Sequence, residues 1–97
     1  MFVTFLKFAG NRAAAPDYLA AHNDWLAQGF DDGAFLCAGT LMPAAGGAIL
    51  ARGESRAEHD ARIATDPFVV QGVVVAETHE IDPKKTAPAL DFLKVSA

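Results

Sequence analysis

The sequence predicts one small α+β domain in which a strand and a helix are followed by two strands, a second helix and a last strand. Some segments have the alternating apolar pattern of strands, others have the 3.6-residue apolar period of helices, and glycine and proline separate them. The chain has 97 residues, and typical domains have about 100–150. We therefore expect a single domain over residues 1–97.

The first strand and the first helix have clear patterns. Met1–Phe8 carries large apolar residues on both faces of an extended segment, which is typical of a central strand. Pro16 suits the first turn of a helix, and from Asp17 to about Phe30 the apolar residues recur with the helical period. The resulting apolar stripe consists of Tyr18, Leu19, His22, Trp25 and Leu26.

The middle of the chain predicts an antiparallel hairpin. Two apolar runs, Ala34–Met42 and Ala48–Arg52, flank the glycine-containing loop Pro43–Gly47. The first run contains Cys37, the only cysteine of the sequence. A lone cysteine cannot form an intramolecular disulfide, and a thiol within an apolar run is usually buried, so we expect Cys37 to serve packing.

The second helix and the fourth strand complete the pattern. Ser55 followed three residues later by Glu58 matches a capping box, which predicts a helix from Ser55 to about Thr65. The pair Asp66-Pro67 ends this helix, because the residue before a proline is pushed out of the α region. The segment Gly72–Ile81 is rich in β-branched residues and predicts a strand that is apolar on both faces.

This order, with a hairpin between the middle strands, indicates a ferredoxin-like βαββαβ fold: an antiparallel sheet with two helices on one face. The first and fourth strands carry apolar residues on the other face as well, so that face needs a cover. A second copy in a two-fold homodimer is the simplest cover. The segment Lys84–Ala97 is too apolar for a free tail, and we expect it to lie against the body or a partner.

Composition argues against two classes of partner. The formal net charge is −4, so the electrostatic attraction that nucleic-acid-binding proteins use is missing. No apolar run approaches the roughly 20 residues of a membrane-spanning helix, and the N-terminus has no basic region of a signal peptide. We expect a cytoplasmic protein that binds neither nucleic acid nor membrane.

Several short motifs occur in the order found in one known family. They are the helix segment His22-Asn23-Asp24-Trp25-Leu26, Gly29, the strand Phe35-Leu36-Cys37-Ala38-Gly39, and Asp66-Pro67-Phe68 followed by Gly72. In these motifs the chain resembles the YCII-related (YciI-like) family, with an extension from about residue 84 to 97. The resemblance implies ferredoxin-like subunits in a dimeric α/β-barrel-type assembly, and a site built on His22 and Asp66.

The His22–Asp66 pair is the candidate catalytic centre. Imidazole titrates near neutral pH, and an adjacent carboxylate fixes its tautomer and stabilises its protonated form, which suits acid–base catalysis. Alternatively, His22 is a hydrogen-bonded histidine at the edge of the core, and Asp66 only satisfies backbone amides at the turn before Pro67.

Other candidates are weaker. Tyr18 and Trp25 lie one helical turn from His22 and could wall a pocket, although core packing would also explain them; Gly39 and Phe68 are further candidates for substrate contact. The second helix has an alanine stripe of Ala57, Ala61 and Ala64, which places His59 on the opposite, solvated face. His79 lies near Glu77 and Glu80 on a strand, and the three histidines lack the spacing of metal ligands. We expect no metal and no cofactor.

Two functions are therefore open. The first is a cofactor-independent enzyme of the lyase, isomerase or hydrolase type, in which the His22–Asp66 pair moves a proton during isomerisation, elimination (including dehalogenation) or hydrolysis of a small molecule. The second is a non-catalytic module that binds a metabolite or another protein through the same cleft.

Overall fold

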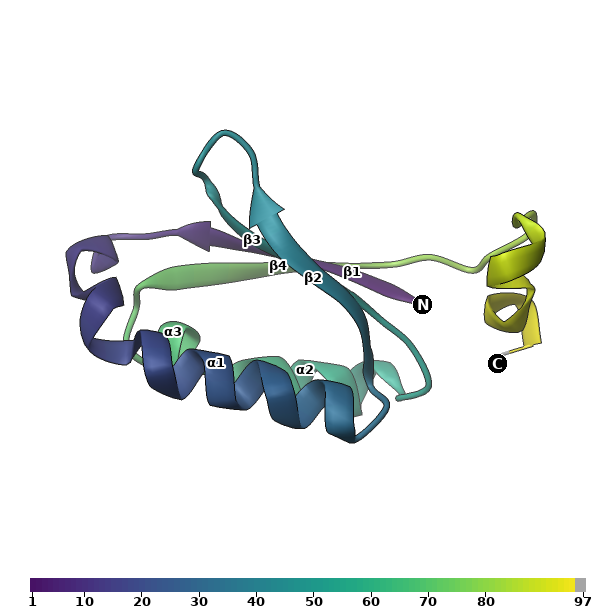
Figure 1. Cartoon of the computed structure of the whole chain (residues 1–97), viewed down its shortest axis with the longest axis horizontal. Coiled ribbons are helices and arrows are strands. Elements are labelled where there is room, and N and C mark those ends of the chain that lie inside the picture. The colour runs from purple at the N-terminus through teal and green to yellow at the C-terminus, as the bar shows by residue number, and fades with distance from the viewer. Residues whose placement is uncertain (96–97) are drawn as a thin grey trace.

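The computed structural model describes residues 1–95 and contains the predicted elements in the predicted order (Figure 1). The strands are β1 (Phe2–Phe8), β2 (Phe35–Leu41), β3 (Gly46–Ala51) and β4 (Val74–Glu80). The helices are α1 (Ala15–Asp31), α2 (Arg56–Ala64) and the short α3 (Pro67–Val70). Two segments of 3-10 helix, η1 (Arg12–Ala14) and η2 (Pro88–Val95), precede α1 and end the described chain.

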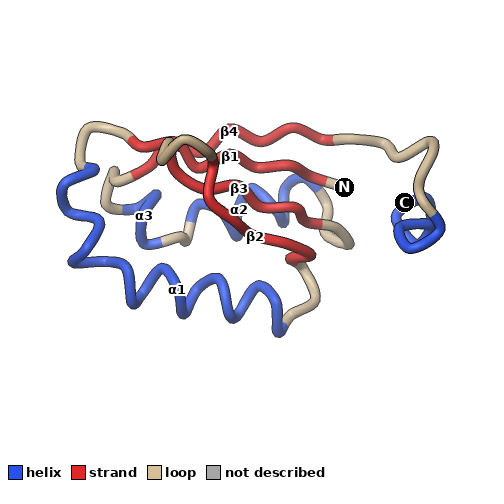
Figure 2. The backbone as a smooth tube through the Cα atoms, turned by 45° about the horizontal axis from the view of Figure 1, so that its top comes forward, coloured by secondary structure: helices blue, strands red, loops and turns tan. Residues whose placement is uncertain are grey.

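The four strands form one antiparallel sheet in the order β2-β3-β1-β4. The predicted central position of β1 is confirmed, and the strand order is compatible with a ferredoxin-like fold. All three α-helices lie on the same side of this sheet (Figure 2). None of the helices in residues 1–95 is long and apolar enough to cross a bilayer.

Alternate strand residues point toward the helices and form the core. On β1 these residues are Phe2, Thr4 and Leu6, all of which are buried. We call the opposite side of the sheet, away from the helices, the open face. The strand registers place on the open face the apolar residues Val3, Phe5, Cys37, Ala48, Leu50 and Val75.

The capping box at the start of α2 is confirmed. The Ser55 hydroxyl accepts a hydrogen bond from the Glu58 amide at 3.1 Å, and the Glu58 carboxylate accepts one from the Ser55 amide at 2.9 Å. The bond from the Ser55 amide to the carboxylate is the largest cause that holds the pKa of Glu58 below its usual value.

Replacing Ser55 with alanine removes the acceptor for the Glu58 amide and should lower the free energy of unfolding by about 1 kcal/mol. Urea denaturation followed by the fluorescence of Trp25 would measure this loss. Ser55→Gly is the matched control, since glycine at this position costs only about a few tenths of a kcal/mol. Equal losses in both variants would contradict the capping role.

The chain does not simply end α2 at Asp66-Pro67, because a short helix that the sequence did not predict starts there. Proline cannot continue α2 but fits the first turn of a new helix. Asp66 caps α3, with its Oδ1 accepting a hydrogen bond from the Phe68 amide at 3.0 Å. The aspartate is thereby fixed at the junction between α2 and α3.

The prediction that His59 is solvated is wrong. His59 is fully buried against the sheet, and its ring stacks on Phe2 with 4.6 Å between the ring centroids. The alanines of the supposed inward stripe are exposed instead. The reason is that α2 turns its large side chain Ile63 inward, and His59 lies one helical turn before Ile63 on the same side.

The predicted burial of Cys37 is also wrong in this structure. Strict alternation from the buried Phe35 would turn Cys37 toward the helices. However, the pairing of β2 with β3 shifts between Phe35 and Cys37, and this irregularity brings Cys37 opposite Leu50. The thiol is therefore exposed on the open face.

The C-terminal segment leaves the sheet after Ile81, and we call residues 82–95 the arm. Leu93 is buried, and the Arg52 guanidinium lies 5.1 Å from the centre of the Phe92 ring. The expectation that the tail contacts the body is thus confirmed for the arm. Residues 96 and 97 lie outside the described structure.

Candidate active site

His22 and Asp66 are in direct contact although they are far apart in the sequence. His22 lies in the middle of α1, and Asp66 lies at the junction of α2 and α3. The distance between His22 Nδ1 and Asp66 Oδ1 is 2.7 Å. The Asp66 side chain is fully buried, whereas 12% of the His22 side chain remains exposed. The Asp66 carboxylate thus contacts the ring from the protein interior, and part of the ring remains exposed at the surface.

This contact determines which ring nitrogen is available for chemistry. A carboxylate can only accept hydrogen bonds, so we assign the ring proton to Nδ1 and a free lone pair to Nε2. Within residues 1–95, no group hydrogen bonds to Nε2. An imidazole in this state can accept a proton at Nε2, and Asp66 then stabilises the positive charge on the ring.

Two aromatic side chains hold the ring of His22 in place. Phe68 stacks on it almost in parallel, with 4.1 Å between the centroids and an angle of 8° between the planes. Trp25 lies against it at 5.8 Å. Asp66 and Phe68 therefore both orient the histidine, one by a hydrogen bond and the other by stacking.

His22 lines a cavity of about 280 Å³ on the helix side of the sheet. The cavity wall is mostly apolar, and apart from His22 no charged or ionisable side chain of residues 1–95 contributes to it. The neutral polar side chains in the wall are Asn23 and Thr40. The remaining wall is formed by Leu6, Phe8, Leu19, Leu26, Ala38, Gly39, Gly46, Gly47, Ala48, Ile49, Phe68 and Val74.

The four predicted substrate-contact residues fall into two groups. Gly39 and Phe68 line the cavity. Tyr18 and Trp25 do not: Tyr18 packs against the core, and Trp25 Nε1 donates hydrogen bonds to the Arg62 carbonyl and to Thr65 Oγ1. Contact of any of these residues with a substrate stays a prediction.

Sequence reasoning missed most of the cavity wall. Leu19 and Leu26 could have been found, because they lie on the helical stripe of His22 at spacings of three and four residues. Asn23 does not belong to the apolar stripe of α1, yet it lies at the cavity. Thr40 belongs to β2, and no local signal connects it to a histidine on α1.

The other histidines lie outside this cavity. His79 Nε2 is 3.3 Å from the Glu77 carboxylate, which also pairs with Lys7 at 3.2 Å, and these contacts hold the pKa of Glu77 below its usual value. In residues 1–95, no group of three or more histidine, cysteine or acidic side chains could hold a metal ion.

Comparison with known families agrees with this architecture. The model of the YCII-related domain matches residues 1–80. The chain belongs to the YCII-related family. The family match ends at residue 80, and the arm lies beyond it.

Among solved structures, this YCII-related domain is similar to 5-chloro-2-hydroxyhydroquinone dehydrochlorinase (TftG) from Burkholderia phenoliruptrix, in its complex with 2,5-dihydroxybenzoquinone. The TM-score is 0.68 at 18% sequence identity, over 84% of this chain and 93% of the other. At this identity the likeness shows a common fold. No curated protein matches the sequence.

Proposed function

We propose that this YCII-related domain is a small-molecule enzyme in which His22, oriented by Asp66, moves a proton. The observation that carries this proposal is the 2.7 Å contact between His22 Nδ1 and the buried Asp66 carboxylate. It leaves Nε2 as the nitrogen that can reach a molecule in the cavity. The chain's own residues suffice for such a step, because proton transfer by a positioned histidine needs no cofactor.

The character of the cavity favours a compact, uncharged substrate. Its wall is mostly apolar, with His22, Asn23 and Thr40 as its polar side chains, and no lysine or arginine of residues 1–95 lines it to hold a carboxylate or phosphate. A hydroxylated ring fits this description, since it can lie against the aliphatic wall and present a hydroxyl group to Nε2. The structural neighbour is named as a dehydrochlorinase of such a ring, so elimination of hydrogen chloride is the reaction to test first.

In this reaction Nε2 removes a proton from a ring hydroxyl and returns it to the carbon that bears chlorine, which gives a keto tautomer. Nε2 then removes a second hydroxyl proton, and the electron pair left on that oxygen forms a C=O bond as the C–Cl bond breaks and chloride departs. Asp66 stabilises the imidazolium that forms, and the proton then passes from Nε2 to water. The products are a quinone-type ring and hydrogen chloride. Isomerisation and hydrolysis would use the same first step with a different fate of the electron pair.

The test is chloride release from chlorinated hydroxyhydroquinones under anaerobic conditions, which limit spontaneous oxidation. Because a positioned general base contributes about 10²–10⁴-fold to a rate, His22→Gln should lower turnover by at least about a hundredfold. His79→Gln is the matched control, since His79 is exposed and outside the cavity.

Unchanged turnover in His22→Gln would refute the role of the histidine. Tight binding of 2,5-dihydroxybenzoquinone by a wild-type protein that turns over no chlorinated ring would instead favour the non-catalytic binding module.

A further inference from the structure

Trp25 lies outside the cavity, but it contacts the part of the chain that carries Asp66. Its Nε1 donates a hydrogen bond to the Arg62 carbonyl at 3.2 Å and to Thr65 Oγ1 at 3.1 Å. The Thr65 hydroxyl in turn donates to the Arg62 carbonyl at 2.7 Å. Thr65 caps the end of α2 and directly precedes Asp66. The indole N–H of α1 is thus bound to the junction between α2 and α3 that holds the carboxylate.

His22 and Trp25 attach α1 to two consecutive residues of this junction. They are three residues apart, so they lie on the same face of the helix. His22 contacts Asp66 at 2.7 Å, and Trp25 contacts Thr65, the residue before it. A single hydrogen bond would allow the helix and the junction to rotate about that bond, whereas two neighbouring attachments fix the direction of the contact as well as its length. The contact between His22 and Asp66 therefore has a second support.

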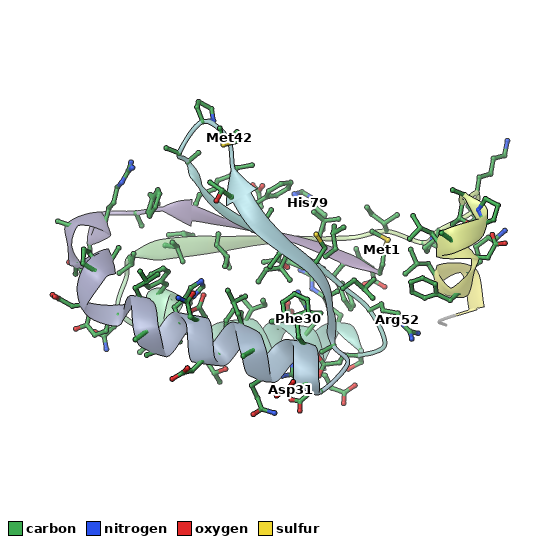
Figure 3. The ribbon with its side chains drawn as sticks, in the orientation of Figure 1. Met1, Phe30, Asp31, Met42, Arg52 and His79 are labelled. Carbon is green, nitrogen blue, oxygen red and sulfur yellow. The ribbon has the colours of Figure 1, made fainter. Side chains whose placement is uncertain are left out.

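The Trp25 ring is also held by the sheet. It packs edge-on against Phe35 of β2, with 5.2 Å between the centroids and an angle of 63° between the planes. Phe30 contacts the same Phe35 ring at 5.9 Å, and Figure 3 shows Phe30 on the side of α1 that faces the sheet. This close approach of α1 depends on Gly29, where a Cβ atom would collide with the Phe35 ring. The indole is therefore anchored to β2, and its N–H can hold the junction in one position.

Another bridge joins α1 to α2 without contacting His22 or Asp66. Asp32, at the end of α1, accepts a hydrogen bond from Arg62 Nη1 at 2.9 Å, and Glu54 accepts one from Arg62 Nε at 2.9 Å. We call these contacts the Arg62 bridge. Asp32 follows His22 by ten residues, which is about 15 Å along a helix. The Arg62 bridge thus shows what a purely structural link between the two helices looks like.

We propose that Trp25 and Thr65 act as positioning residues for the histidine–aspartate pair of the site. Their hydrogen bond holds the junction so that Asp66 Oδ1 stays within reach of His22 Nδ1. This contact keeps the ring proton on Nδ1 and the lone pair on Nε2, where a substrate would meet it. The effect on turnover rests on the proposed function, whereas the effect on the ring proton does not depend on any reaction.

The position of the ring proton of His22 is a readout that a merely structural role would not change. At a pH well above the ordinary histidine pKa of about 6.5, the NMR chemical shifts of the ring nitrogens distinguish the Nδ1–H tautomer from the Nε2–H tautomer. The spectrum of His22→Gln identifies the signals. Wild type should show the Nδ1–H tautomer. Trp25→Phe keeps an aromatic ring but has no N–H, so it should show a mixture of both, and its turnover should fall by about tenfold or more at unchanged KM.

Thr65 offers a second pair of variants in case Trp25→Phe folds poorly. Thr65→Val removes the hydroxyl and should shift the ring proton of His22 in the same direction, whereas Thr65→Ser retains the hydroxyl and should resemble wild type. Asp32→Ala is the control for a general loosening of α1 against α2, because it removes the contact of α1 with the Arg62 bridge. It should lower the free energy of unfolding and leave the tautomer and the turnover unchanged.

Wild-type tautomer populations in both Trp25→Phe and Thr65→Val would overturn the proposal, and so would an equal shift in Asp32→Ala. If wild type turns over no chlorinated ring while the tautomer populations shift as expected, the positioning role is supported and the proposed function alone is refuted.

Discussion

Asp66→Ala should lower the free energy of unfolding by about 2–6 kcal/mol, because two donors lose their acceptor at a buried site and each such loss costs about 1–3 kcal/mol. Two donors depend on this side chain: His22 Nδ1 at 2.7 Å and the Phe68 amide at 3.0 Å, both bound to Oδ1. Alanine leaves both without an acceptor and removes the cap of α3. Urea denaturation followed by Trp25 fluorescence would measure the change.

Asp66→Asn should separate the effect of Asp66 on stability from its effect on turnover. The asparagine oxygen can accept both hydrogen bonds in place of Oδ1, and its amide nitrogen takes the place of Oδ2, which has no hydrogen-bonding partner in the described structure. We therefore expect a loss of only about 1 kcal/mol, the scale of a single hydrogen bond. Turnover should nevertheless fall, because a neutral amide cannot stabilise the imidazolium. An asparagine variant as unstable as the alanine variant would show that the charge itself holds the fold together.

Acid should destabilise the domain through His59. The ring is buried, its Nε2 is 2.7 Å from Thr4 Oγ1, and its Nδ1 has no partner among residues 1–95. Burial lowers the pKa of His59 below its usual 6.5. The unfolded chain therefore takes up this proton at a higher pH than the folded chain, so stability is complete above about pH 6.5 and falls as the pH drops below that value. Each unit by which the pKa is lowered contributes about 1.4 kcal/mol.

His59→Leu provides the comparison, since leucine retains an apolar side chain on Phe2 but cannot titrate. Denaturation curves between pH 7.5 and roughly 4.5, below the ordinary histidine pKa, should show a smaller acid loss in this variant than in wild type. The histidine His79 is exposed, so His79→Gln should keep the wild-type dependence. If the free energy of unfolding depends on pH in the same way in wild type and in His59→Leu, then His59 is not the source of the acid-induced loss of stability.

Local patterns predicted the framework of this fold well. The strands, both main helices and the capping box follow from periodicity and from side chains within a few residues of each other. Where a pattern allows a helix to turn either of two faces toward the sheet, tertiary packing determines which face is buried. The alanines of α2 are small enough to be tolerated on either face, so the burial of Ile63 and His59 could not be read from that helix alone.

The site was predictable only in part, for a related reason. His22 and Asp66 were singled out together because of the motifs around them, and their contact is present. The opposite wall of the cavity comes from β2 and β3, around Gly39 and Gly47, and depends on how these strands pass over α1. The exposure of Cys37 could not be predicted from local alternation either, because one irregularity in strand pairing reverses the side to which the thiol points.

Asp66 both contacts His22 and caps α3, and this double role has an evolutionary consequence. Its bond to the Phe68 amide starts α3 whether or not a histidine occupies position 22. A descendant that lost His22 would lose the proposed base, yet selection for a folded chain would still retain the aspartate and the proline after it. An Asp-Pro-Phe sequence in a relative therefore indicates the junction between α2 and α3, and the residue that faces Asp66 from α1 indicates whether the proposed proton transfer is available.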